Sequence, residues 1–163
     1  MKASYRVSQE TVRLAADRPV RLQRIASVNE VSPHDHEFYE VCFVLDGAGR
    51  HDTPDIERSI RRGSVLVLAP GQVHAIRQPR NLGVINLYYL DEWLLGDAGT
   101  GWDDDGVTEL FLLGSLIRRA GALPARQVEL GEKECERCEH ELDDLDRELD
   151  RERPSLAFLK ATL

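Results

Sequence analysis

Three histidines and one glutamate are the residues whose types and spacing could do chemistry. His34, His36 and Glu40 lie two and four residues apart, so in an extended strand their side chains would leave the same face. His74 begins a later predicted strand and can approach the other three across a closed barrel. Imidazole and carboxylate groups bind Zn, Ni, Fe or Mn and leave positions open for water or a ligand. We therefore predict a metal or ligand site made of these four residues; the alternative is a pocket in which they only hydrogen-bond.

Short strands must position these residues. Between residues 20 and 90, β-rich runs are separated by turns such as Asp46-Gly47 and Arg62-Gly63, which supply the backbone angles that tight turns need. This spacing predicts an antiparallel barrel or sandwich. The expected strands lie near residues 20–28, 38–45, 49–52, 56–61, 64–69, 74–77 and 82–90.

The chain on either side of these strands has a different pattern. Residues 1–19 are weakly patterned and are interpreted as an N-terminal arm that orders when ligand binds, with a frayed terminus as the alternative. A loop rich in glycine and aspartate follows the last strand and leads into helices. We therefore expect an arm (1–19), a β-barrel (20–95), and a linker with a helical segment (96–163).

Two helices are expected in the C-terminal segment. Residues 107–119 place leucine and isoleucine side chains on one face. In residues 132–152, apolar side chains recur at spacings of 3 and 4 and form a heptad seam of Cys135, Cys138, Leu142, Leu145 and Leu149. We expect this seam to pair with a second copy in a homodimer; packing on the chain's own barrel is the alternative. A leucine stripe that resumes at Leu156 predicts that the protein continues beyond residue 163.

The negative charge is concentrated in one segment. The formal net charge is −8, and residues 132–153 hold eleven acidic side chains against five Lys/Arg. A negative chain without a basic stripe repels phosphate backbones, so we do not expect these residues to bind nucleic acid. Apolar runs fall short of the roughly 18 residues that a membrane span needs, and three cysteines are too few for a disulfide framework. These features predict a cytoplasmic protein with reduced thiols.

The histidine spacing resembles that of the cupin superfamily. The first cupin motif matches His34-x-His36-x3-Glu40-x6-Gly47, and the second matches Gly63, Gly71 and His74. The sequence departs from the motifs at three positions, where Val28, Ala69 and Gln78 replace the usual glycine, proline and asparagine. The resemblance implies a mainly β fold, a double-stranded β-helix or jelly-roll barrel, followed by C-terminal α-helices. It also implies that all four metal-binding positions of metal-dependent cupins carry residues able to bind a metal.

A narrower resemblance covers residues 20–163. The stretches 34–41, 45–49, 63–75 and 84–89 are similar to the N-terminal effector domain of AraC-type transcription regulators. This resemblance implies a domain that binds a small, often sugar-like effector in the barrel and dimerises through the helices beside it. DNA would be bound through two helix-turn-helix units that are absent from this chain.

Four further residues are candidates for contacts with such an effector. Arg24 lies in the first predicted strand and Gln72 beside the second motif, and both can hydrogen-bond a hydroxylated ligand. Asn86 and Tyr88 share parity in an aliphatic strand, so their polar groups can face the cavity. For all four, an ordinary position at the rim or at the end of the barrel is the alternative.

Two functions are therefore predicted from the sequence. The first is the ligand-sensing and dimerisation domain of a bacterial AraC-type regulator, which is not an enzyme. The alternative is a metal-dependent cupin enzyme, a dioxygenase or an isomerase, that uses the same four residues to hold iron or manganese. The acidic heptad helix favours the regulator, whereas the complete ligand set favours the enzyme.

Overall fold

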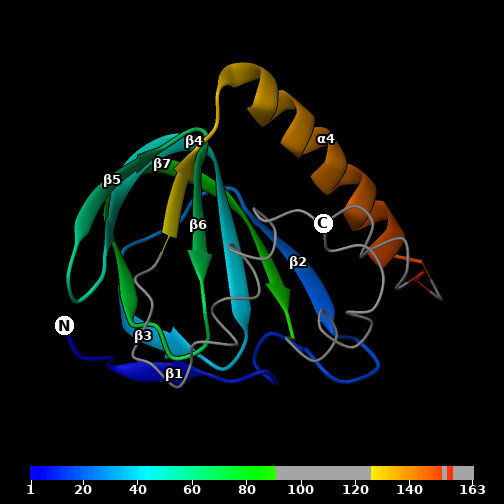
Figure 1. Ribbon diagram of the computed structural model, residues 1–163, viewed down its shortest axis with the longest axis horizontal. Helices are drawn as coiled ribbons and strands as arrows, with labels where there is room; N and C mark the ends of the chain where they lie inside the picture. Colours follow the sequence, from blue (N-terminus) through cyan, green and yellow to red (C-terminus); the bar gives the residue numbers. More distant parts are fainter. Residues whose placement is uncertain (91–125, 152–153, 156–163) are drawn as a thin grey trace, which may run out of the picture.

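The computed structural model describes residues 1–90, 126–151 and 154–155. They form strands and one helix, so the predicted mainly β fold with a C-terminal helix is confirmed (Figure 1). The elements are β1 (Tyr5–Val7), β2 (Val20–Ile25), β3 (Val31–His36), β4 (Tyr39–Asp52), β5 (Glu57–Arg61), β6 (Ser64–Leu68), β7 (His74–Tyr89), β8 (Arg126–Glu129) and α4 (Glu132–Leu149).

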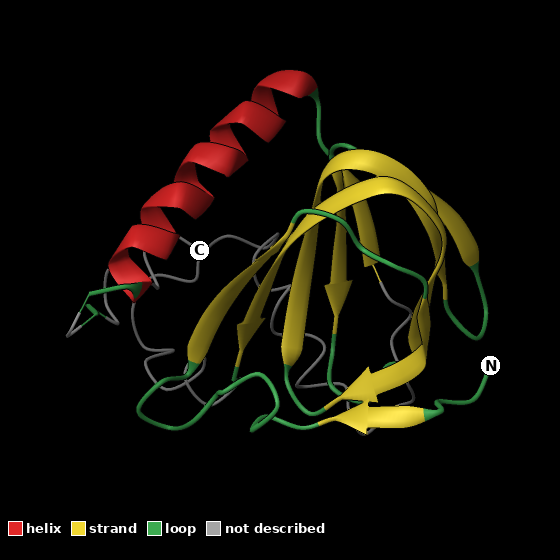
Figure 2. Ribbon diagram, turned by 180° about the vertical axis from the view of Figure 1, so that it is seen from behind, coloured by secondary structure: helices red, strands yellow, loops and turns green. Residues whose placement is uncertain are grey.

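Two long strands organise the sheet. β4 and β7 pair antiparallel along their whole length, and the other strands join them on either side. Where β4 begins and β7 ends, β2 pairs with β7 and β6 pairs with β4, and β8 extends the sheet beyond β6. Where β4 ends and β7 begins, β3 pairs with β7 and β5 pairs with β4. The sheet curls strongly (Figure 2), although in the described residues its hydrogen-bonded path is not closed. The resulting barrel therefore has a concave inner face and a convex outer face.

The long strands correct the predicted strand pattern. Residues 38–45 and 49–52, expected as two strands, form the single strand β4, and residues 74–77 and 82–90 likewise form β7. The chain bends at Gly47 without ending the strand. Gly47 has φ +71°, and an added Cβ would lie 2.2 Å from the Asn81 carbonyl oxygen. Only glycine fits at this bulge, where β4 comes very close to the backbone of β7.

Three strands were not predicted from the sequence. β3 contains Pro33 and three charged or titratable side chains, which is a poor strand composition. β8 joins the edge of β6 from residues outside the predicted barrel limits of 20–95. β1 pairs in parallel with β3, so at Tyr5–Val7 the predicted arm is a strand of the sheet and not a frayed terminus.

Helix α4 covers the outer face of the sheet. Its residues Leu142 and Leu145 are buried in a core with Val41 and Val67, from β4 and β6, and with Leu87 of β7. The heptad seam thus faces the chain's own strands. Figures 1 and 2 show α4 running along the outside of the sheet from two sides. In the described residues the seam packs on the chain's own barrel, as the intramolecular alternative predicted.

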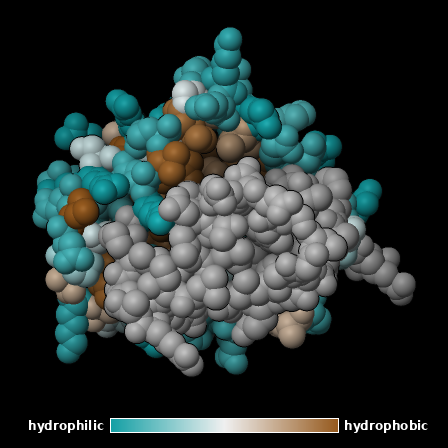
Figure 3. Space-filling model, viewed as in Figure 1, coloured by the Kyte–Doolittle hydropathy of each residue, from teal (hydrophilic) through white to brown (hydrophobic). Residues whose placement is uncertain are grey.

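Two arginines fasten α4 to the barrel. Arg62, in the β5–β6 turn, forms ion pairs with Glu139 at 2.6 Å and Glu132 at 3.6 Å. Arg24, on β2, forms ion pairs with Asp143 and Asp146 nearer the other end of the helix. The acidic side chains that the sequence concentrates here are thus partly neutralised by the barrel, and the remainder give a hydrophilic surface in the region of α4 (Figure 3).

Several predicted features lie outside the described residues. These are the glycine- and aspartate-rich loop, the helix at 107–119 and the stripe from residue 156. In the described part of the chain, no helix is long and apolar enough to cross a membrane.

Candidate functional site

A cavity of about 190 Å³ lies on the inner face of the sheet. Its walls come from strands β2, β3, β4, β6 and β7, and residues Val7 and Val12 of the N-terminal segment also line it. The remaining lining residues are Ile25, Val28, Val31, His34, His36, Phe38, Glu40, Cys42, Leu66, Leu68, His74, Ile76, Leu82, Val84, Asn86 and Tyr88. The cavity therefore contains all four predicted metal-binding residues.

Three of these residues converge most closely. The ligand atoms of His36, Glu40 and His74 all lie within 4.8 Å of one another, and all three side chains are buried. The pairing of β3 with β7 places His34 directly opposite His74. The backbone N–H of Gly71 donates to the His36 carbonyl at 2.9 Å and ties the second motif to the first.

The predicted reason for this convergence needs correction. His34 and His36 lie on β3, which ends at His36, whereas Glu40 lies on β4, which begins at Tyr39. A single extended strand from residue 34 to residue 40 is therefore absent. The carboxylate reaches the imidazoles because the chain turns at Glu37–Phe38 and brings two strands around the same cavity.

Backbone hydrogen bonds orient two of the imidazole rings. The Nδ1 of His36 lies 2.6 Å from the Phe38 carbonyl oxygen, and that of His34 lies 3.0 Å from the Ser32 carbonyl oxygen. A carbonyl only accepts, so in both rings Nδ1 carries the hydrogen and Nε2 is left with a free lone pair. Ring orientation by such a backbone contact is typical of metal-binding histidines.

The buried polar atoms of the cluster fit a divalent metal. Within the described residues, His36 Nε2 and both ring nitrogens of His74 are buried without a hydrogen-bond partner. His36 Nε2 faces a carboxyl oxygen of Glu40 at 3.4 Å. Unpaired buried polar groups cost free energy, and a shared cation would satisfy these nitrogens together with the carboxylate. The donor set suits the transition metals predicted from the sequence.

Burial sets the protonation of these groups. It lowers the pKa of His36 to about 4 and that of His74 well below its usual value, and it raises the pKa of Glu40 to about 7. Both imidazoles are therefore neutral at neutral pH, which is the form that binds a metal.

His34 lies beside this group of three and contacts it through its ring. The ring centroids of His34 and His74 are 4.2 Å apart, and Tyr5 of β1 stacks on His34 at 5.1 Å with nearly parallel planes. Arg6 adds a two-pronged ion pair to Asp35 on the neighbouring strand. The N-terminal segment thus covers the cluster where β3 ends.

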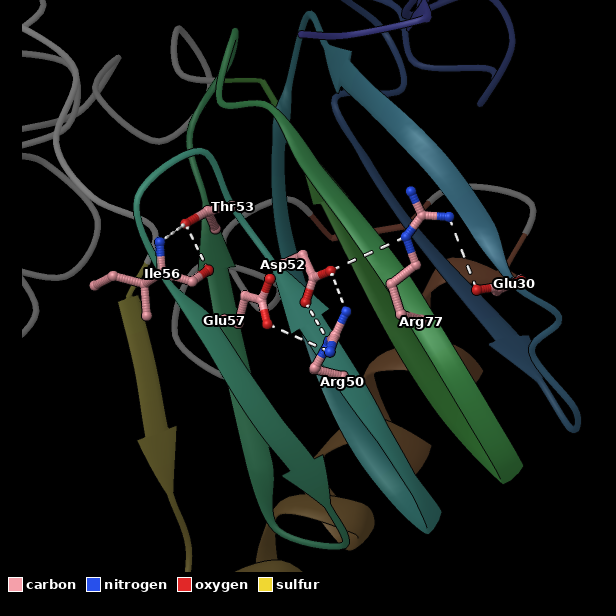
Figure 4. Close-up of polar contacts among 7 residues, drawn as sticks. All are labelled: Glu30, Arg50, Asp52, Thr53, Ile56, Glu57 and Arg77. Carbon is pink, nitrogen blue, oxygen red and sulfur yellow. Dashed lines mark hydrogen bonds and ion pairs between the residues drawn. The ribbon is translucent and has the colours of Figure 1, made fainter. Parts of the chain in front are cut away.

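Sequence reasoning missed a fourth histidine, His51. It is 3 % exposed, its Nε2 has no hydrogen-bond partner in the described residues, and its ring centroid lies 5.5 Å from that of His74. Figure 4 shows that the flanking Arg50 and Asp52 point into a surface ion-pair network with Arg77, Glu30 and Glu57. Since neighbouring side chains of a strand leave opposite faces, this network directs His51 toward the inside.

The four predicted effector contacts divide into two pairs. Asn86 and Tyr88 line the cavity, where the Asn86 amide donates to the Tyr88 hydroxyl at 3.0 Å and that hydroxyl donates to Gln23 at 3.1 Å. Arg24 and Gln72 are not among its lining residues. Arg24 points to α4, and the Gln72 side chain accepts a hydrogen bond from the Ala69 backbone within its own turn.

The comparison with protein families agrees with this geometry. Residues 21–124 match the model of a family described as the AraC-like ligand binding domain. The chain belongs to this family. The match includes the cavity strands from β2 to β7 and therefore every predicted metal-binding residue.

Solved structures of other proteins align with parts of this chain. Apo ToxT K231A from Vibrio cholerae strain SCE256 aligns with 88 % of this chain and 51 % of its own, with 12 % identity and a TM-score of 0.57. Smaller proteins align over less of the chain. NMB1881 from Neisseria meningitidis is 18 % identical over 44 % of this chain and 74 % of its own, with a TM-score of 0.40. KdgF from Halomonas sp. is 20 % identical over 44 % and 69 %, with a TM-score of 0.39.

The chain spans about half the length of ToxT, and at these identities the likeness concerns the fold alone. A comparison with curated protein sequences gave no match.

Proposed function

We propose that this chain is the ligand-sensing domain of an AraC-type bacterial transcription regulator and is not an enzyme. A small-molecule effector would occupy the cavity, and a DNA-binding part outside this chain would respond to it. One observation carries the proposal: β4 and β7 line the cavity with one face and pack against α4 with the other. A ligand that shifts these strands necessarily changes the surface on which α4 lies.

The proposed site includes a divalent metal. His36, Glu40 and His74 would hold it, with His34 alongside, and Zn, Ni, Fe or Mn suits this donor set. When bound, such a metal supplies a Lewis-acidic position for a polar atom of the effector. The backbone carbonyls of Phe38 and Ser32 keep the His36 and His34 rings oriented toward the cavity.

The N-terminal segment and α4 are the two elements that a bound effector can move. Val7 and Val12 line the cavity, and Leu14 packs with Phe38 and Tyr88 beside it. Ligand binding shifts an equilibrium between two arrangements only if the ligand prefers one of them. Contact with a covering segment provides such a preference, since the segment can close only over a ligand that fits.

Hydrogen exchange with Zn²⁺ as the probe tests the metal part of this proposal. We expect the purified chain to bind Zn²⁺ and to show slower amide exchange in residues 5–14 and in the β4–β7 pair. His74→Ala should abolish both effects, whereas His140→Ala, an exposed histidine on α4, should leave them unchanged. Equal zinc binding by the parent chain and His74→Ala would contradict the site. The gene sequence after codon 163 tests the regulator, which requires helix-turn-helix units there.

An iron-dependent cupin enzyme is the second candidate. Two histidines and one carboxylate form the ligand set of many non-haem Fe(II) oxygenases, and His36, Glu40 and His74 supply that set. Oxygen uptake by the Fe(II)-loaded chain, compared with His74→Ala, distinguishes the two functions. The sensor proposal expects equal, background uptake from both proteins.

Homodimerisation through C-terminal helices is also part of the proposal. The seam of α4 is occupied by the barrel, so any part that α4 plays must use its outer, hydrophilic side. Sedimentation at several protein concentrations measures the oligomeric state. We place the regulator in the cytoplasm, where it meets DNA through its separate DNA-binding part.

A further inference from the structure

The cavity is chemically divided along its length. The register of β4 with β7 pairs Glu40 with Tyr88, then Cys42 with Asn86, then Val44 with Val84. Glu40 and Tyr88 therefore lie where β4 begins and β7 ends, and Glu40 comes close to His74, which pairs with His34 where β7 begins. Farther along the same walls, the lining is aliphatic and belongs to a core of Leu66, Ile76, Leu82 and Val84 with Ile25, Val28 and Val31 packed against it.

This division fits poorly with a sugar. A monosaccharide carries hydroxyls around its whole ring, and each buried hydroxyl without a partner costs about 1–3 kcal/mol. The aliphatic end of the cavity offers no side-chain partner for them. Asn86 and Tyr88, the polar residues nearest that end, bond to each other, and Asn86 Oδ1 is left as a buried acceptor without a partner in the described residues. These walls therefore offer few partners for the several hydroxyls of a sugar ring.

The size of the cavity limits the hydrocarbon part of the ligand. Its volume is about 190 Å³. An aliphatic cavity of roughly 150 Å³ stays dry and accepts benzene in a model protein. The cavity therefore suits a body of about one six-membered ring, and a long acyl chain or a fused ring system would require the walls to move.

The polar end determines the head group. A divalent metal held by two neutral imidazoles and one carboxylate carries a net positive charge, which favours an anionic oxygen as the next ligand. Among the described residues that line the cavity, none is lysine or arginine, so the metal centre is the attractive group that this part of the chain offers to the anion.

We propose that the effector is a small carboxylate or similar oxyanion with a hydrocarbon body about the size of one ring. Its body lies against Leu66, Ile76 and Val84, and its head faces His36, Glu40 and His74. This inference rests on the proposed function and adds the chemical class of the effector.

Calorimetry on the zinc-loaded chain tests the proposed class with three probes. Benzoate combines a single ring with an anionic head, benzyl alcohol keeps the ring with a neutral head, and D-glucose has neither feature. We expect benzoate to bind, benzyl alcohol to bind at least about tenfold more weakly because it lacks the charge, and D-glucose to give no signal. Binding of D-glucose as tight as that of benzoate would overturn the inference.

Matched valine-to-threonine variants test the position of the hydrocarbon body. Val84→Thr keeps the shape of the aliphatic wall but adds a hydroxyl, and Val128→Thr makes the same change on the exposed strand β8. We expect Val84→Thr to weaken benzoate binding about fivefold or more and Val128→Thr to leave it unchanged. Val28→Thr, at a half-buried position of the same wall, provides a second variant if Val84→Thr unfolds. Parent-like affinity in a folded wall variant would overturn the proposed position.

Zinc analysis of the same samples distinguishes a failure of the proposed metal centre from a failure of the proposed effector class. If the parent chain takes up no zinc, the proposed metal centre fails and the anionic head group fails with it. If zinc is bound but benzoate is not, only the inferred effector class fails and the metal centre stands.

Discussion

The two faces of the β4–β7 pair differ in how their buried side chains are satisfied. On the outer face, Val41, Leu87 and Leu145 form a closed apolar core, and charged groups at its edge are paired with arginine. On the inner face, His36, His74 and His51 bury ring nitrogens that have no partner in the described residues. Folding alone does not explain the inner arrangement, because unpaired buried polar atoms destabilise a protein. The outer face therefore stabilises the domain, and the inner face is organised for a ligand.

Leu145→Ala should give the largest effect on stability. Leu145 is 1 % exposed at the centre of the outer core. Removing its side chain should lower the free energy of unfolding by about 3 kcal/mol, because transfer and cavity costs add. Urea denaturation measures this loss, with Val128→Ala as the exposed control. If the faces are independent, zinc affinity at a temperature where the variant is folded stays at the parent value.

His74→Ala should abolish zinc binding and leave the stability of the metal-free chain almost unchanged, the reverse of Leu145→Ala. The free energy of unfolding without metal should change little, because the lost contacts are offset by removal of two unpaired nitrogens. The parent chain should gain about 2.7 kcal/mol at a Zn²⁺ concentration about 100 times the dissociation constant, and the variant should lose that gain. Urea titrations with and without Zn²⁺ measure both quantities, with His140→Ala as control. An equal gain in the variant would mean that the inner face is not a metal site.

His51→Ala should weaken zinc binding, but less than His74→Ala does. His51 packs edge-on beside His74 and limits the orientations of that ring. Without it, we expect zinc affinity to fall by about tenfold, the lower end of the range for residues that orient metal ligands. A competition titration against a zinc-binding dye gives the affinity. An unchanged value would restrict the site to the residues of the sequence motifs.

Arg24→Gln should have the smallest effect. Its ion pairs with Asp143 and Asp146 are half-exposed, and such pairs contribute about 0–1 kcal/mol to stability. Unfolding in low and high salt measures the contribution, which should shrink as salt rises. Because Arg24 belongs to the outer face, zinc and benzoate affinities should match those of the parent chain. Weaker benzoate binding would restore Arg24 as an effector contact.

The contrast between the faces also explains what the sequence could predict. The spacing from His34 to Gly47 and from Gly63 to His74 identified the barrel and its cluster, because these motifs fix both turn geometry and side-chain type. The heptad seam identified α4 and its buried face correctly. It could not reveal the partner of that face, since an apolar stripe packs equally well on a neighbouring helix or on a sheet.

Bulges account for the residue that was missed. Strict alternation from Glu40 puts position 51 on the opposite side of the strand, because the two positions differ by an odd number. In the structure the pairing of β4 with β7 shifts register three times between Val44 and Arg50. A bulge adds a residue and reverses the parity beyond it. The sequence also could not place Arg24, because its partners Asp143 and Asp146 lie more than a hundred residues away along the chain.

Arginine side chains attach α4 to the barrel at two places along its length. Arg62 pairs with Glu132 and Glu139 in the first half of the helix, and Arg24 pairs with Asp143 and Asp146 in the second half. The 18 residues of the helix form a rod roughly 27 Å long between β2 and the β5–β6 turn. A shift of β2 relative to that turn therefore tilts the whole rod, and a tilt of about 5° moves one end relative to the other by roughly 2 Å.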